Sequence, residues 1–121
     1  MHKILIIDDE SSVRKMLKKL LEKNGYQTLE ANDGKQGIAL YKKHEPELII
    51  TDLIMPEKEG LETIKELKKI DPDVKIIAMS GGGITDPKIY LNFASKLGAV
   101  RTFTKPVDNG ILLSTIKEIF S

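Results

Sequence analysis

Apolar residues follow two patterns along this chain. They form short unbroken runs, such as Ile4 to Ile7 and Leu48 to Ile50, and between the runs they recur every three or four positions. A short unbroken run is typical of a strand that is buried on both faces, and the wider spacing indicates an amphipathic helix. The pattern therefore predicts five strands that alternate with helices. The expected strands are 3–7, 26–31, 47–52, 74–79 and 99–103.

This alternation predicts an α/β fold with a parallel sheet and helices on both faces. Right-handed crossover connections leave few topologies for such a chain. We expect a flavodoxin-like, doubly wound, five-stranded parallel sheet with the strand order 2-1-3-4-5. That order places the first and third strands side by side, so that their carboxyl ends share one edge of the sheet.

Several residues indicate where the helices begin and end. Ser11 is the candidate N-cap of the first helix, and Gly25 favours the left-handed conformation that ends it. Asp86, followed by a proline, is the candidate cap of the fourth helix, and Asp108 begins the last. We expect the basic residues of the first helix to form a solvated face: Arg14, Lys15, Lys18, Lys19 and Lys23.

Apolar spacing defines the fourth and fifth helices. The fourth helix is predicted from the spacing of Ile89, Phe93, Ala94 and Leu97. The last helix is expected to turn four residues inward: Leu112, Ile116, Ile119 and Phe120.

Composition narrows the possible function classes. The 121 residues fit one domain over 1–121. The absence of cysteine excludes a disulfide framework, a thiolate metal site and a cysteine nucleophile. A net charge of +1 provides no general attraction to nucleic acid or to an anionic membrane, and no apolar run is long enough to span a bilayer. Because the first strand begins at once, we expect no signal peptide and a cytoplasmic location.

Polar residues come at the end of four predicted strands. Asp8 and Asp9 follow the first strand, Asp52 the third, Ser80 the fourth and Lys105 the fifth. Ligands of open parallel sheets bind outside the carboxyl ends of the strands. The predicted fold therefore collects three carboxylates, a hydroxyl and an ammonium at one edge.

This set of groups suits a divalent cation and a phosphoryl group. Neighbouring carboxylates repel each other unless a cation lies between them, and Mg²⁺ prefers oxygen ligands (Mn²⁺ is an alternative). A carboxylate can attack phosphorus to form an aspartyl phosphate. Lys105 would contribute a point charge, and the Ser80 hydroxyl would donate to a phosphoryl oxygen. Alone, each residue has an ordinary structural explanation, such as a helix cap, a turn or a surface lysine; their joint placement favours chemistry.

These residues resemble the receiver domain of two-component response regulators. The resemblance covers essentially the whole chain and rests on four ordered segments: 6–10 (Ile-Ile-Asp-Asp-Glu), 52–56 with Gly60, 78–81 (Ala-Met-Ser-Gly) and 104–106 (Thr-Lys-Pro). Each segment alone is a weak signal, whereas the ordered set is highly specific. The resemblance implies a switch that is phosphorylated by a histidine kinase or a phosphotransfer protein.

The resemblance also assigns roles. It implies that Asp52 accepts the phosphoryl group, that Asp9 ligates Mg²⁺ directly, and that Asp8 acts largely through water. The backbone carbonyl of Ile54 would complete the protein ligands of the metal, together with Asp52. Ser80 would be the switch hydroxyl and Lys105 the ion-pair partner of the phosphoryl group. The family further implies a cis peptide bond before Pro106.

The chain departs from the family at three places. Thr102 stands where the family often has an aromatic residue, and strand alternation sends Phe103 to the other face. Gly81 stands where alanine is common, and two more glycines follow, so we expect a mobile loop. Ile54 and Gly82 offer no polar group that would orient a hydrolytic water, so we expect slow self-dephosphorylation.

Partners follow from the same resemblance. Output would pass through the last two β–α units to an output domain or partner protein, with Ile84, Tyr90, Lys96 and Arg101 as candidate contacts, and a homodimer is conceivable. We expect no direct contact with nucleic acid or membrane. The alternatives are a Mg²⁺-dependent phosphohydrolase with an aspartyl nucleophile, a flavin-binding module and a docking scaffold that is not phosphorylated. Whether the domain stands alone or belongs to a longer regulator stays open.

Overall fold

The computed structural model describes residues 2–53, 59–81 and 87–121. Strands and helices alternate through these residues, as predicted: β1 (Lys3–Ile7), α1 (Ser11–Lys23), β2 (Gln27–Ala31), α2 (Gly34–His44), β3 (Leu48–Asp52), α3 (Glu59–Ile70), β4 (Ile76–Ser80), α4 (Pro87–Leu97), β5 (Arg101–Thr104) and α5 (Asn109–Phe120). The expected strand boundaries agree to within two residues. Ile54, Gly82, Ile84 and Asp86, to which the sequence assigns roles, lie outside the described residues, as does the side chain of Tyr90.

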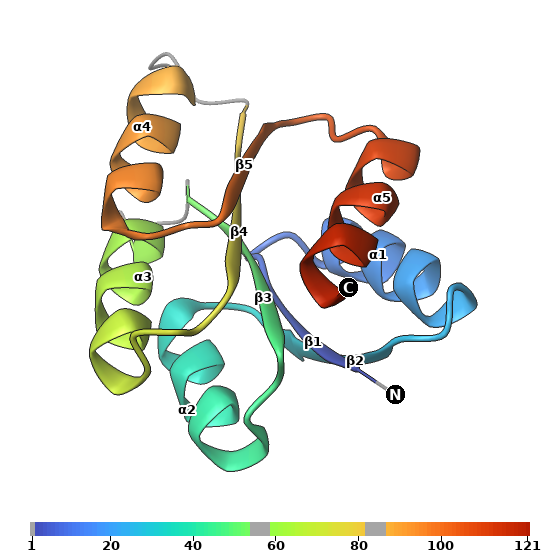
Figure 1. Ribbon diagram of the computed structural model, residues 1–121, viewed down its shortest axis with the longest axis horizontal. Helices are drawn as coiled ribbons and strands as arrows, with labels where there is room; N and C mark the ends of the chain where they lie inside the picture. The colour runs from blue at the N-terminus through green and yellow to red at the C-terminus, as the bar shows by residue number, and fades with distance from the viewer. Residues whose placement is uncertain (1, 54–58, 82–86) are drawn as a thin grey trace.

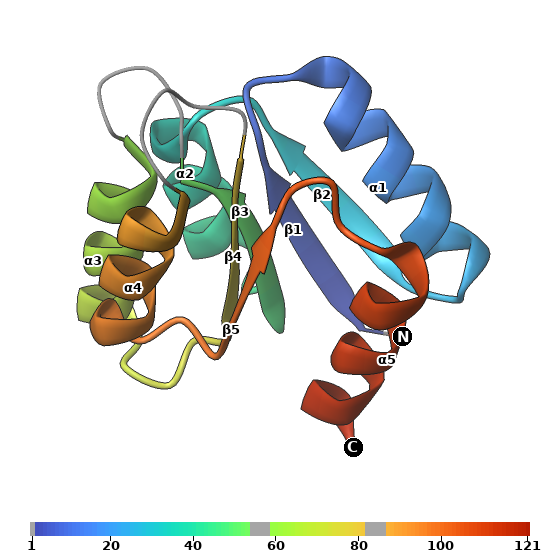
Figure 2. The same ribbon diagram turned by 90° about the horizontal axis from the view of Figure 1, so that it is seen from above.

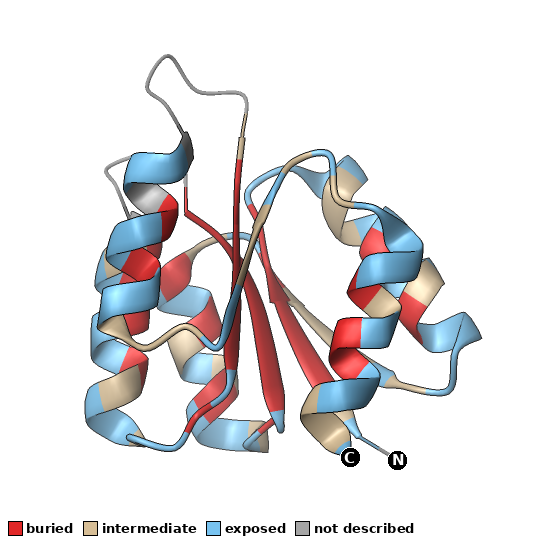
Figure 3. Ribbon diagram, turned by 45° about the horizontal axis from the view of Figure 1, so that its top comes forward, coloured by how far each residue is buried: buried red, intermediate tan, exposed pale blue. Residues whose placement is uncertain are grey.

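The sheet has the order β2-β1-β3-β4-β5, and every neighbouring pair is parallel, which confirms the predicted topology. Figures 1 and 2 show α1 and α5 on one face of the sheet and α2, α3 and α4 on the other. Ile4 and Ile6 pack toward α1 and α5, whereas Leu5 and Ile7 pack toward the other three helices. Both faces of the central strands are therefore buried (Figure 3), which explains their unbroken apolar runs.

The start of α1 differs from the prediction by one residue. Glu10, not Ser11, is the N-cap, and its side chain makes no capping hydrogen bond. The Asp8 side chain accepts the Glu10 backbone N–H at 2.9 Å, and the Glu10 carbonyl accepts the Arg14 N–H at 3.1 Å. The aspartate that follows β1 therefore determines where the helix begins. Two other predicted ends are confirmed: Gly25 has φ +90° after α1, and Asp108 caps α5.

The apolar residues that predict α4 lie on two different faces. Leu91 and Ala94 are buried against the sheet, and Leu97 packs beside them. Ile89 and Phe93, by contrast, are 48% and 52% exposed. In α5, Leu112 and Ile116 are buried as expected, and Ile119 and Phe120 are partly covered at the end of the helix. In the described part of the chain, no helix has the length and apolar character that crossing a membrane requires.

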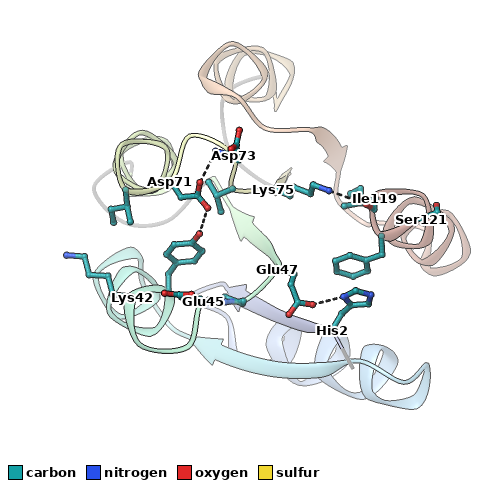
Figure 4. A pocket seen from close by; sticks show the side chains of 14 residues that line it. His2, Lys42, Glu45, Glu47, Asp71, Asp73, Lys75, Ile119 and Ser121 are labelled. Carbon is teal, nitrogen blue, oxygen red and sulfur yellow. Dashed lines mark hydrogen bonds and ion pairs between the residues drawn. The ribbon is translucent and has the colours of Figure 1, made fainter.

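A polar hollow of about 760 Å³ lies at the end of the sheet where the strands begin (Figure 4). The Tyr41 hydroxyl, from α2, donates to Asp71 at 2.8 Å and so ties α2 to the end of α3. His2 lies 2.6 Å from a Glu47 carboxylate oxygen and stacks on Phe120 of α5 with 4.0 Å between ring centroids. These contacts hold this end of the fold together, away from the carboxyl edge.

Tyr41→Phe tests how the buried Tyr41 hydroxyl affects the stability of the fold at alkaline pH. Burial, the hydrogen bond to Asp71 and the charge of Asp71 raise the pKa of Tyr41 to about 12. The folded state therefore holds this proton more tightly than the unfolded chain, in which tyrosine titrates near pH 10. The stability that this proton contributes is complete below about pH 10 and is lost as the pH rises toward 12. We expect the free energy of unfolding to fall more steeply above about pH 10 in the parent than in Tyr41→Phe.

Urea unfolding of both proteins from neutral to alkaline pH measures the difference. Tyr26→Phe is the control, because Tyr26 lies at the other face of the sheet against Phe120. Equal slopes for the parent and Tyr41→Phe would contradict the assignment.

Candidate functional site

The fold brings the predicted polar residues to the carboxyl edge of the sheet. Asp8 directly follows β1, Asp52 ends β3, and Ser80 ends β4. Asp8 and Ser80 are fully buried, and Asp52 is 2% exposed. β1 and β3 pair in register, so Asp8 and Asp52 come from neighbouring strand ends. Asp9, by contrast, is exposed at the mouth of the site.

Lys105 joins the two buried carboxylates. Its ammonium nitrogen lies 3.1 Å from Asp8 Oδ2 and 3.3 Å from Asp52 Oδ2. Burial by itself would lower the pKa of Lys105, but the charges of Asp52 and Asp8 and the hydrogen bonds to them outweigh it, so the pKa lies above its ordinary value. The lysine stays charged, and it reduces the repulsion between the two carboxylates.

Ser80 differs from the residues around it because its hydroxyl has no partner. Among the residues that the structure describes, Ser80 Oγ is the buried side-chain polar atom without a hydrogen bond. The backbone of Ser80 is fixed, since its carbonyl accepts the Lys105 N–H at 2.9 Å. A buried hydroxyl without a partner is unfavourable, so an incoming oxygen acceptor would gain a hydrogen bond here.

A group of three carboxylates can hold a cation. One oxygen from each of Asp8, Asp9 and Glu10 lies within 4.8 Å of the others. These are the hard oxygen donors that Mg²⁺ prefers, so the residues present fit that ion. Glu10 belongs to the matching sequence segment, but nothing in its position along the chain marks it as a metal ligand.

Arg14 is the second residue of the site that sequence reasoning missed. It is predicted to belong to a solvated basic face, yet its guanidinium donates to the Asp8 backbone carbonyl at 2.6 Å. Arg14 Nε also lies 3.5 Å from a Glu30 carboxylate oxygen on β2. The Asp8 carbonyl belongs to the peptide that joins Asp8 to Asp9, so Arg14 fixes the orientation of that peptide. Helical spacing cannot distinguish this arginine from the exposed lysines around it.

Two glycines allow backbone segments to approach the site closely. A Cβ on Gly60 would lie 2.5 Å from Leu53 Cα and 2.6 Å from the Asp52 carbonyl oxygen. A Cβ on Gly81 would lie 2.8 Å from Lys105 Cβ. Both positions therefore require glycine in this arrangement. The sequence predicts a mobile loop at Gly81. The structure gives a different reason for a glycine at this position, which is its close packing against Lys105.

The β5 segment agrees with the sequence analysis. Thr102 pairs with Ala78, which packs toward α2, α3 and α4, whereas Phe103 packs toward α1 and α5. Phe103 therefore does not replace an aromatic residue at position 102. The Lys105–Pro106 peptide bond is cis, as the resemblance implies.

Comparisons with known proteins agree on one family. The family model described as "Response regulator receiver domain" matches residues 4–117. The chain is 43% identical to the chemotaxis protein CheY of Bacillus subtilis, over 97% of this chain and 96% of that protein. It is 34% identical to the sporulation initiation phosphotransferase F of the same organism, over 96% and 91% of the two chains. A receiver domain protein from Clostridium thermocellum superposes with a TM-score of 0.90 at 32% identity, covering 98% and 94% of the two chains.

Lys105→Met tests the role of the ammonium. The substitution leaves two buried carboxylates without their cation, so we expect it to lower the free energy of unfolding by about 3 kcal/mol in the presence of a chelator. Combining Lys105→Met with Asp52→Asn removes one of the two negative charges and should recover most of the lost free energy of unfolding. Lys117→Met, at an exposed position of α5, is the matched control. Urea unfolding at neutral pH measures all four proteins, and an equal effect of the two lysine substitutions would refute the role.

Proposed function

The chain belongs to the response regulator receiver domain family, the phosphorylation-dependent switches of two-component signalling, and on this basis we propose that Asp52 accepts the phosphoryl group. Residues 1–121 would act as one receiver domain. The observation that carries the proposal is the unpartnered, buried Ser80 hydroxyl at the edge where Lys105 contacts Asp52. A phosphoryl group on Asp52 would bring oxygen acceptors for that hydroxyl and negative charge for the ammonium.

The proposed reaction transfers a phosphoryl group from a donor histidine to Asp52. An Asp52 carboxylate oxygen attacks phosphorus, a P–O bond forms, and the P–N bond to the donor histidine breaks. The imidazole nitrogen keeps the electron pair and is protonated from solvent. Lys105 stabilises the negative charge on the phosphoryl oxygens, and the Ser80 hydroxyl donates a hydrogen bond to one of them.

Mg²⁺ is the proposed cofactor. Asp9, Asp8 and Asp52 would hold it, together with the Ile54 backbone carbonyl, which lies outside the described residues. When bound, Mg²⁺ neutralises and orients phosphoryl oxygens. Lys105 already contacts two of these carboxylates, so the ammonium and a bound metal would share one acidic site.

A groove beside the site suits the phosphodonor. It has a volume of about 580 Å³ and lies between α1 and the start of α5, with Val13, Met16 and Val107 on its apolar wall and Lys105 and Gly81 at the site. We propose that the histidine-bearing partner docks here and reaches Asp52. Because such phosphoryl groups derive from ATP, the domain would work in the cytoplasm.

Output is proposed to pass through the face of α4, β5 and α5. Arg101 is exposed there as expected, whereas Lys96, which is also exposed, lines a groove on the α3 side of α4 instead. Arg101 also lies 4.0 Å from Glu118 of α5, so this pair is accessible to an output domain or a partner. Movement of the Ser80 hydroxyl toward a phosphoryl group would be the first step of the switch.

The first test is phosphorylation by acetyl phosphate. In the presence of Mg²⁺ we expect the intact protein to gain the mass of one phosphoryl group, and we expect no gain for Asp52→Asn or with a chelator. Asp73→Asn, an exposed aspartate at the other end of the sheet, is the matched control and should react like the parent. A parent that neither gains mass nor binds beryllofluoride would be a docking scaffold, whereas catalytic release of phosphate from added esters would support a phosphohydrolase.

Arg14→Gln tests whether Arg14 orients the peptide bond between Asp8 and Asp9. Loss of the 2.6 Å contact frees the Asp8 carbonyl, and we expect Mg²⁺ affinity to fall about tenfold, in the range known for residues that orient metal ligands. Saturating Mg²⁺ should restore the phosphorylation rate.

Lys18→Gln is the control, because Lys18 also lies near Glu30, at 3.8 Å. Calorimetric titration with Mg²⁺ gives the affinity independently of phosphorylation. Unchanged affinity in Arg14→Gln would rule out the positioning role.

A further inference from the structure

A groove of about 360 Å³ runs between α3 and α4, the two helices that lie side by side in Figures 1 and 2. It lies on the α3 side of α4, away from the proposed output face with β5 and α5. Three residues of each helix line it: Leu61, Glu62 and Lys65 from α3, and Phe93, Lys96 and Leu97 from α4.

The α4 side of this groove is unusually apolar for a surface. Phe93 lines the groove and is 52% exposed, and Ile89, one helical turn earlier on the same stripe, is 48% exposed. The residues that hold α4 on the sheet are Leu91 and Ala94, so neither exposed side chain is needed for that contact. An exposed aromatic residue beside a groove is a typical anchor point for a bound segment.

Charge indicates what kind of segment fits. α4 carries two lysines, Lys88 and Lys96, and its sequence contains no acidic residue. Lys65 adds a third positive charge from the α3 side, where Glu62 is the acidic residue of the lining. A second copy of this chain would bring the lysines of two α4 helices close together, which is unfavourable. An acidic partner would be attracted.

We propose that the α3–α4 groove binds an acidic segment of a partner protein, which inserts an apolar side chain against Phe93 and places carboxylates near Lys65 and Lys96. Such a segment would bind as amphipathic helices do in apolar grooves. The inference goes beyond the proposed function, because it assigns a second docking surface that is separate from the phosphodonor groove and from the face of α4, β5 and α5.

Selection of peptides tests the proposal. A display library of random peptides is panned on the full chain, with and without Mg²⁺ and beryllofluoride. We expect the enriched peptides to combine apolar and acidic residues. Their affinity should fall at least about tenfold for Phe93→Ser and for the double variant Lys65→Glu/Lys96→Glu.

Matched variants away from this groove serve as controls. Ile70→Ser removes another exposed apolar side chain, itself 40% exposed, at the end of α3, and Lys19→Glu/Lys23→Glu reverses two exposed charges on α1; both should leave the affinity within about twofold. Phosphorylation of each variant by acetyl phosphate shows that it is folded, and it separates a failure of this proposal from a failure of the proposed function.

Three results would overturn the proposal. The first is a failure to obtain peptides that depend on Phe93, whether because nothing is enriched or because the enriched peptides bind Phe93→Ser as well as the parent. The second is enrichment of basic peptides. The third is a dimer in sedimentation experiments that Phe93→Ser dissociates, because the occupant would then be a second copy of the chain.

Discussion

Two buried carboxylates share one ammonium at the carboxyl edge of this sheet, and the rest of the site is arranged around that contact. Asp8 and Asp52 come from neighbouring strands, and two buried negative charges this close repel each other unless a cation lies beside them. Lys105 supplies the charge from the end of β5, which lies beside β4, and the missing Cβ of Gly81 leaves room for Lys105 there. A doubly wound sheet is the framework that brings these three strand ends together.

The same contact makes the site responsive. The ammonium neutralises the carboxylates in the absence of a ligand, and a metal ion or phosphoryl group changes the charge that it faces. The Ser80 hydroxyl is a second group that can respond to a ligand, because it is buried and makes no hydrogen bond within the described residues. A buried donor without an acceptor favours any state that provides one. Charge and hydrogen bonding therefore favour the same phosphorylated state.

The sequence predicts the fold well because the information is local and repeated. Unbroken apolar runs define strands that both layers of helices cover, and residues such as Gly25 and Asp108 mark helix ends through their own backbone preferences. The site residues could be predicted for a related reason, since a parallel sheet collects whatever follows its strands. Arg14 could not be, because a guanidinium on a basic helix has the same spacing whether it faces water or a backbone carbonyl.

The fourth helix shows the limit of periodicity most clearly. A spacing of three and four residues predicts a helix, but it does not tell which apolar residues meet the sheet. Ile89 and Phe93 satisfy the pattern as well as Ala94 does, yet both are exposed, and Phe93 lines the groove toward α3. Packing against the sheet accounts for Leu91 and Ala94 and leaves these two side chains without a role in the core. α4 therefore carries more apolar surface than the core needs, and its only charged residues are lysines. The proposed binding of an acidic segment explains this composition, whereas the folding of α4 does not.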